Sequence, residues 1–111
     1  MAFKIAFASS DGKIVNQNFG RANRFQIFRI KNLSAEFIEL RENVPPCKGN
    51  EHLDEAMNNS VELVSDCKAV FVSRIGYGEL KVFEDKNIKV YEAPYFISDI
   101  LGKLFSKGYE I

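Results

Sequence analysis

Apolar residues alternate with polar or small residues in the first third of the chain, a period of two that is typical of β-strands. The alternation covers 3–8, 24–30 and 35–41, and turn-forming residues occupy 9–12 and 31–34. The last of these strand segments carries two glutamates and an arginine, charges that suit an edge strand because they discourage pairing with another chain. Since the connections are short, we expect an antiparallel meander.

The pattern changes after two consecutive prolines. From there, apolar residues recur at helical spacing in 50–64, 78–86 and 96–107. A continuous apolar run at 68–73 predicts a strand buried on both faces, and 88–91 predicts a further strand. The predicted order of elements is therefore β-β-β-α-β-α-β-α.

This order predicts an α/β fold with one mixed sheet. Right-handed helical crossovers would make the last two strands parallel to the first. Counted along the chain, the expected strand order is 3-2-1-4-5, with only the second strand reversed and with helices on both faces. The direction of the chain connections changes between the first and fourth strands, so a crevice is expected at their carboxyl ends.

The loop that leaves the first strand carries candidate polar groups for this crevice. Its later part, 16–22, combines amides, an aromatic residue, a glycine and an arginine. The candidate ligand contacts from this loop are Ser9, Ser10, Asn18, Phe19, Gly20 and Arg21. Such a loop could hydrogen-bond a polar anion, or it could simply connect to the second strand.

The loop that leaves the fourth strand carries Arg74, Gly76 and Gly78. Two glycines before a helix allow positive φ angles and let backbone N–H groups point at an anion, which the helix dipole also favours. Glycines here can also do no more than turn the chain from strand to helix. The neighbouring Arg74 favours the anion site.

A third loop, 45–49, leads toward the first predicted helix and carries Cys47. This thiol lies next to Lys48 and before the expected amino end of a helix capped by Asn50, and both features favour thiolate. His52 is expected in the first turn of that helix, so the two side chains could face one cavity. Sulfur and imidazole suit iron, zinc or copper, but the pair supplies only two of the four ligands of a structural zinc site. The alternative is a surface cysteine and a solvated histidine.

The remaining polar residues argue against catalysis. Two-metal hydrolysis needs several converging carboxylates, and only Asp11 is expected at the crevice. A nucleophilic Ser9 or Ser10 would need a base, yet the chain has a single histidine and no GxSxG elbow. Cys67 directly precedes the buried strand and is expected to be a core residue. We therefore expect a protein that is not an enzyme.

Composition narrows the class further. The 111 residues suit one domain, and 46% apolar content excludes a disordered chain. Fifteen basic against 15 acidic residues argue against a dedicated nucleic-acid binder. No apolar run is long enough to cross a membrane, and the start is too short for a secretory signal. The two cysteines lie 20 positions apart without a CxxC pair, so a cytoplasmic protein with free thiols is expected.

Several segments, in this order, resemble one known family. The matching runs are AFASSDG at 6–12, NFGRANRF at 18–25, DCKAV at 66–70, RIGYG at 74–78 and IKVYEA at 88–93, together with Cys47 and His52. They resemble the dinitrogenase iron–molybdenum cofactor biosynthesis family, that is, the NifX-like domain that is also found at the carboxyl end of NifB proteins. The resemblance runs over nearly the whole chain, so 1–111 is expected to be a single NifX-like cofactor-binding domain.

The resemblance implies a three-layer ribonuclease H-like fold without nuclease activity. It also implies that the domain binds or carries an iron–sulfur cluster or an iron–molybdenum cofactor precursor, although similar domains in organisms that do not fix nitrogen leave the cargo open. The family commonly has histidine where this chain has Asn18. A neutral amide is a poorer iron ligand than imidazole, so this change either weakens cluster binding or shifts metal binding onto Cys47 and His52.

The first hypothesis is therefore a non-catalytic carrier, in which the two soft ligands bond to an anionic metal cluster and the arginines and turn amides neutralise its charge. A metal-free module for small anions is the second. The third is an interaction domain that docks onto a cofactor-assembly protein. No nucleic-acid or membrane partner is expected.

Overall fold

The computed structural model describes residues 2–45, 47–48, 51–52 and 54–107, with the backbone alone at 47–48, 51–52 and 54–56. The main sheet contains β1 (Phe3–Ala8), β2 (Arg24–Lys31), β3 (Ser34–Glu42), β6 (Ala69–Val72) and β7 (Lys89–Glu92). Its order is β3-β2-β1-β6-β7, and β2 runs antiparallel to its neighbours while β1, β6 and β7 are parallel. The predicted sheet order and the single reversed strand are confirmed.

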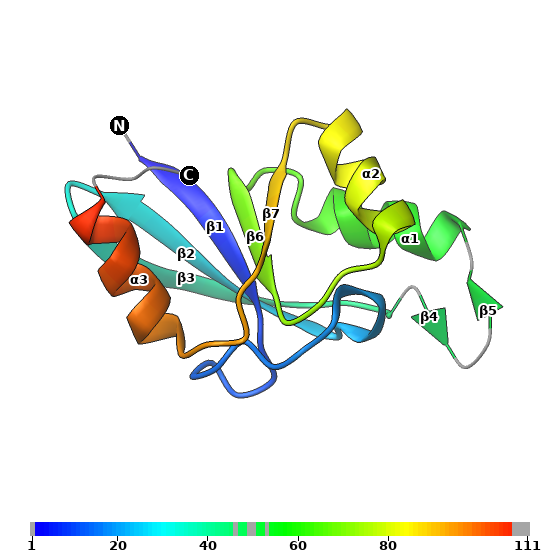
Figure 1. The fold of residues 1–111 in the computed structure, drawn as a ribbon, viewed down its shortest axis with the longest axis horizontal. Helices are drawn as coiled ribbons and strands as arrows, with labels where there is room; N and C mark the ends of the chain where they lie inside the picture. The colour runs from blue at the N-terminus through cyan, green and yellow to red at the C-terminus, as the bar shows by residue number, and fades with distance from the viewer. Residues whose placement is uncertain (1, 46, 49–50, 53, 108–111) are drawn as a thin grey trace.

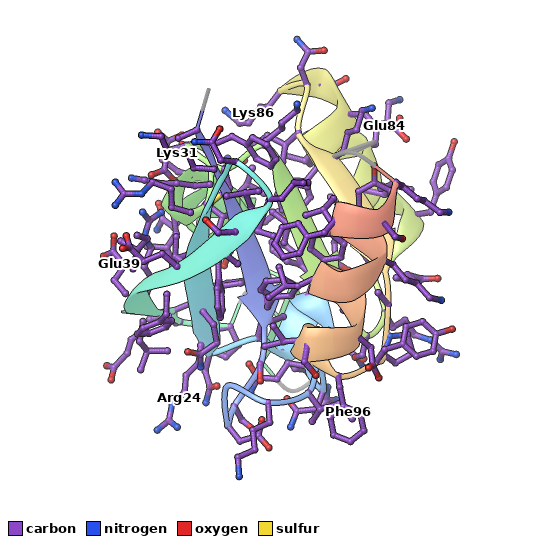
Figure 2. All side chains as sticks on the ribbon, turned by 90° about the vertical axis from the view of Figure 1, so that its left-hand side faces the viewer. Arg24, Lys31, Glu39, Glu84, Lys86 and Phe96 are labelled. Atoms are coloured by element: carbon purple, nitrogen blue, oxygen red, sulfur yellow. The ribbon has the colours of Figure 1, made fainter. Side chains whose placement is uncertain are left out.

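Helices cover the two faces of this sheet unequally. On one side lie α1 (Asp54–Leu63) and α2 (Tyr77–Asp85), and on the other lies α3 (Ile97–Ser106) (Figure 1). No helix in the described part of the chain is both long and apolar enough to span a membrane. Seen from the α3 end, β3 with Glu39 lies to the left, away from α3, so the α3 side of the β3 edge is left uncovered (Figure 2).

Alternation in β1 divides the core into two parts. Ala6 and Ala8 contribute to the cluster under α1 and α2, whereas Ile5 and Phe7 contribute to the cluster under α3. The small residues leave space for bulkier groups from other elements, among them Phe19 and Phe83, whose rings meet edge to face at 4.8 Å. The sequence pattern of large and small residues therefore sets which helix each face of the sheet accepts.

An ion-pair cluster joins the edge strand to the helical layer. The Arg41 guanidinium on β3 donates to both carboxylate oxygens of Asp66, at 2.7 and 2.9 Å, and to the Leu63 carbonyl at 2.8 Å. Lys4 adds a further contact to Asp66 at 3.3 Å. The Arg41 hydrogen bonds, and then Lys4, hold the pKa of Asp66 well below its usual range and outweigh its partial desolvation.

The first predicted helix is wrong at its amino end. A hairpin of β4 (Cys47–Lys48) and β5 (Glu51–His52) precedes α1, which begins at Asp54, so His52 lies in a strand and not in a helical turn. Every apolar position of the predicted stripe lies at residue 53 or later, so the pattern placed no constraint on 50–52. The proposed cap, Asn50, lies outside the described residues.

Candidate functional site

The loop that follows β1 is joined to the end of β6 by backbone hydrogen bonds. The Ser73 N–H donates to the Gln17 carbonyl at 3.0 Å, and the Phe19 N–H donates to the Arg74 carbonyl at 2.9 Å. Between these bonds, Asn18 and Arg74 form a parallel β-bridge. Two of the three predicted loops therefore meet, and we call Asn18–Arg21 together with Ser73 and Arg74 the rim.

The rim lies at the carboxyl ends of the parallel strands. In Figure 1 the loop after β1 passes below the sheet and turns back toward the end of β6. Figure 2 shows Arg24, which follows this loop, at the same lower end as Phe96, opposite Lys31 and Lys86. This is the end at which open α/β sheets place ligands.

A buried aromatic ring anchors the rim. Phe19 begins the short 3₁₀ helix η1 (Phe19–Arg21), and its side chain is fully buried among core residues, with Phe25 6.2 Å from its ring centre. Gly20, which follows, is half-buried. The ring of Phe19 therefore holds the loop against the core, and it offers no surface to a ligand.

Three polar side chains of the rim are exposed. The Asn18 Oδ1 accepts a hydrogen bond from the Ser73 hydroxyl at 2.7 Å. The guanidinium groups of Arg21 and Arg74 are in solvent and have no hydrogen-bond or ion-pair partner among the described residues. This part of the rim thus offers positive charge and N–H donors that the described protein does not itself use.

The glycine turn differs from the prediction. Gly76 has φ of −75° and caps α2, Gly78 lies inside that helix, and Gly12 is the one described glycine with positive φ. The positive φ that glycine allows is therefore not adopted at 76 or 78. The turn already binds two carboxylates of the protein. Glu92 Oε2 accepts from the Ile75 N–H at 3.0 Å, and Glu79 Oε1 accepts from the Gly76 N–H at 3.3 Å.

The Glu79 carboxylate lies close to Gly76. A Cβ built there would lie 2.7 Å from the Glu79 Oε1, so a larger residue would require that carboxylate, the end of a flexible side chain, to shift. The sequence held the relevant signal, a glutamate three residues after the helix cap, which is half of a capping box. The amides of 75 and 76 are thus occupied by the chain itself, and an anion would have to displace Glu92 or Glu79 to reach them.

The serines after β1 build a turn. Ser9 is fully buried, and its hydroxyl accepts from the Gly12 N–H at 3.0 Å and donates to Asp11 at 3.2 Å. The Asp11 carboxylate accepts hydrogen bonds from the Lys13 and Ile14 N–H groups, at 2.8 and 3.2 Å, and these bonds lower its pKa. The Ser10 hydroxyl accepts from Asn16 at 2.9 Å. These contacts shape the loop, and Ser10 is the exposed member.

The backbone brings the soft-ligand residues to neighbouring positions. Cys47 and His52 are direct cross-strand partners in the β4–β5 hairpin, and β4 contacts η1 of the rim. Their side chains lie outside the described structure. No group of three or more His, Cys, Asp or Glu side chains suited to a metal ion occurs among the described residues.

The other cysteine behaves as expected of a core residue. Cys67 is buried and free, and burial, followed by the neighbouring Asp66 charge, raises the pKa of its thiol to about 12. It is therefore a neutral thiol at physiological pH and a poor metal ligand.

A hollow of about 420 Å³ lies beside α3 and is lined by none of the rim residues. None of the other predicted site residues lines it either.

Comparison with known proteins gives a consistent result. The family described as "Dinitrogenase iron-molybdenum cofactor" matches residues 1–107. The FeMo cofactor biosynthesis protein NifB of Frankia alni is 31% identical over 102 residues, which are 89% of this chain and 19% of that protein. Protein NifX of Klebsiella pneumoniae is 32% identical over 75 residues, 68% of this chain and 46% of that protein. The chain thus spans less than half the length of these relatives.

Solved structures share the fold. The crystal structure of PH0822 superposes with a TM-score of 0.70 at 20% identity and covers 94% of this chain and 90% of its own. A structure from Methanocaldococcus jannaschii gives a TM-score of 0.60 at 21% identity over 98% of this chain and 92% of its own. At these identities the similarity establishes the arrangement of strands and helices.

Proposed function

We propose a carrier function from the premise that the chain belongs to the dinitrogenase iron-molybdenum cofactor family. In this proposal the domain binds an anionic iron–sulfur cluster or an iron–molybdenum cofactor-type species and passes it on without transforming it. The observation that carries the proposal is the bridged rim beside the hairpin of Cys47 and His52. It presents an exposed amide and two guanidiniums that have no partner in the part of the chain that the structure describes.

Each part of the rim would have a separate role. Cys47 and His52 would bond to iron, because thiolate and imidazole are ligands that iron accepts. Arg21 and Arg74 would donate charge-assisted hydrogen bonds to the sulfido or carboxylate atoms of the cargo. The Gly78 N–H, which has no intrahelical acceptor in the first turn of α2, would add a neutral donor. Ser10 and the Gly20 backbone would line the same rim.

The proposal has wider consequences for the chain. The fold would be the ribonuclease H-like arrangement without nuclease chemistry, and 1–111 would act as a single cofactor-binding domain. A protein of a cofactor-assembly pathway would supply or receive the cargo. The cytoplasmic location expected from the sequence stays a prediction.

Anaerobic reconstitution tests the carrier function. Purified protein would be incubated with ferrous iron and sulfide, desalted, and analysed for iron, for sulfide and for its absorption and EPR spectra. We expect bound iron and sulfide in the wild-type protein and their loss in a Cys47→Ala/His52→Ala double variant. A Cys67→Ala variant is the matched control, because that thiol is buried and neutral.

Two results would contradict the carrier. Wild-type protein without bound iron would exclude it, and unchanged iron in the double variant would exclude the assigned ligands.

A metal-free module for small anions is the second candidate, favoured by the hydrogen-bonded amide of Asn18 at the rim. Under that alternative, phosphates, nucleotides or carboxylates would raise the melting temperature of metal-free protein, and failure of every anion to do so would exclude it.

A further inference from the structure

We infer that Ser73 is a positioning residue that holds the Asn18 side chain as a hydrogen-bond donor toward the cargo. The inference rests on the proposed function, since it assumes that the rim binds a cargo. It adds a chemical requirement that the carrier function alone does not contain. The atoms of the cargo that meet position 18 must be hydrogen-bond acceptors and not a bare metal ion.

The side-chain amide of Asn18 is already hydrogen-bonded through its oxygen. Its Oδ1 accepts the Ser73 hydroxyl hydrogen at 2.7 Å, a short and favourable O–H···O distance. An amide whose oxygen is engaged in this way turns its NH₂ group away from that hydroxyl. The side chain is exposed, and its Nδ2 has no acceptor among the described residues. Two N–H donors are therefore available to a ligand.

The backbone on both sides fixes this orientation. The bonds from the Ser73 N–H to Gln17 and from the Phe19 N–H to Arg74 flank Asn18, and the buried ring of Phe19 prevents the loop from moving outward. Among the described residues, the Ser73 hydroxyl thus makes the one side-chain hydrogen bond of Asn18, while the loop position depends on other groups. Removal of the hydroxyl should free the amide and leave the loop in place.

The donor assignment limits what the rim can recognise. Nδ2 donors together with the cations of Arg21 and Arg74 would repel a bare metal cation and attract an anion with acceptor atoms. Bridging sulfides of a metal–sulfur cluster, or the oxygens of an oxyanion, meet this requirement. Metal–ligand bonds would then come from elsewhere in the proposed site, and position 18 would help to hold the anionic surface of the cargo.

Tetrathiomolybdate, a dianion of molybdenum and sulfur, is the probe for the test. Its binding would be measured by titration calorimetry to wild-type protein and to three variants, Ser73→Ala, Ser73→Thr and Asn18→Asp. We expect Ser73→Ala to weaken binding about three- to tenfold, the effect of one net hydrogen bond. Ser73→Thr keeps the hydroxyl and should restore wild-type affinity. Asn18→Asp replaces donors by a negative acceptor and should weaken binding by tenfold or more.

A spectroscopic measurement separates positioning from a general structural effect. In ¹⁵N-labelled protein, the Asn18 side-chain NH₂ signals, assigned by their absence in Asn18→Asp, should shift when the probe is added. Backbone signals of 17–21 should stay in place in Ser73→Ala. If the wild-type protein binds the probe and Ser73→Ala binds it equally well, the inference is wrong and the carrier function stands. If the wild-type protein does not bind the probe, the inference is wrong, and the carrier function is then decided by the iron and sulfide reconstitution alone.

Discussion

Arginine occupies two very different settings in this fold. On the β3 edge, Arg41 is largely buried and donates to Asp66, to Glu39 and to a backbone carbonyl, and these bonds raise its pKa above the ordinary value. At the rim, Arg21 and Arg74 are exposed and have no such partners among the described residues. The comparison separates charges that hold the fold together from charges that remain available to a ligand.

The largest predicted effect concerns the anchor of the rim. Phe19→Ala removes a fully buried ring and should lower the free energy of unfolding by about 3–5 kcal/mol. Phe37→Ala on the β3 edge is the matched control, because 53% of that side chain is exposed, and it should cost less than about 1 kcal/mol. Urea unfolding measures both. Equal losses would show that the rim is not held by its buried ring.

The arrangement of the backbone could be predicted from the sequence, whereas contacts of single polar side chains could not. The first three strands followed from alternation, since each face of β1 meets a different helical layer, and β6 followed from its continuous apolar run. The sheet order followed from the connections. The sequence also predicted correctly that the loops after β1 and β6 lie at the same edge of the sheet. Contacts of single polar groups were missed, because a serine at the end of an apolar run gives no signal that its hydroxyl reaches Asn18.

Two errors have physical causes. The hairpin before α1 contains no apolar pattern, so nothing in 50–52 distinguished strand from helix. The glycine turn resembled a free anion site because the local signal of Glu79, three residues after Gly76, was overlooked and because the other occupant, Glu92, comes from β7. Whether the Ile75 amide is free thus depends on a long-range contact, which composition does not show.

The rim arginines should matter for binding and not for stability. Arg74→Ala should leave the free energy of unfolding within about 0.5 kcal/mol of wild type, because the guanidinium has no described partner. Its loss should weaken tetrathiomolybdate binding about tenfold, within the range for one charge-assisted hydrogen bond. Lys81→Ala, an exposed cation on α2, should change neither quantity. A marked loss of stability in Arg74→Ala would show that this arginine, like Arg41, holds the fold together.

Acid should weaken the β3 edge through Asp66. The folded pKa of this carboxyl lies below its unfolded value, so its ion pairs contribute above about pH 4 and are lost as the pH falls toward the folded pKa. Asp66→Asn should lower the free energy of unfolding by about 1 kcal/mol at pH 7, a modest figure because the side chain is 45% exposed. It should also flatten the decline of that free energy below about pH 4. Asp85 forms no ion pair among the described residues, so Asp85→Asn should preserve the decline of stability in urea unfolding measured at each pH. An unchanged acid decline in Asp66→Asn would contradict this assignment.

The smallest effect is a gain at the turn between β2 and β3. Asn32 and Leu33 have φ of 51° and 61°, the conformation of a type I′ turn, which asparagine tolerates and leucine does not favour. Leu33→Gly removes about 1 kcal/mol of strain, and the added entropy of the unfolded glycine offsets part of this, so a net gain of about 0.5 kcal/mol is expected. Asn32→Gly should gain less. A melting temperature of Leu33→Gly below that of the wild type would contradict this, and would indicate that the leucine packs favourably although 59% of it is exposed.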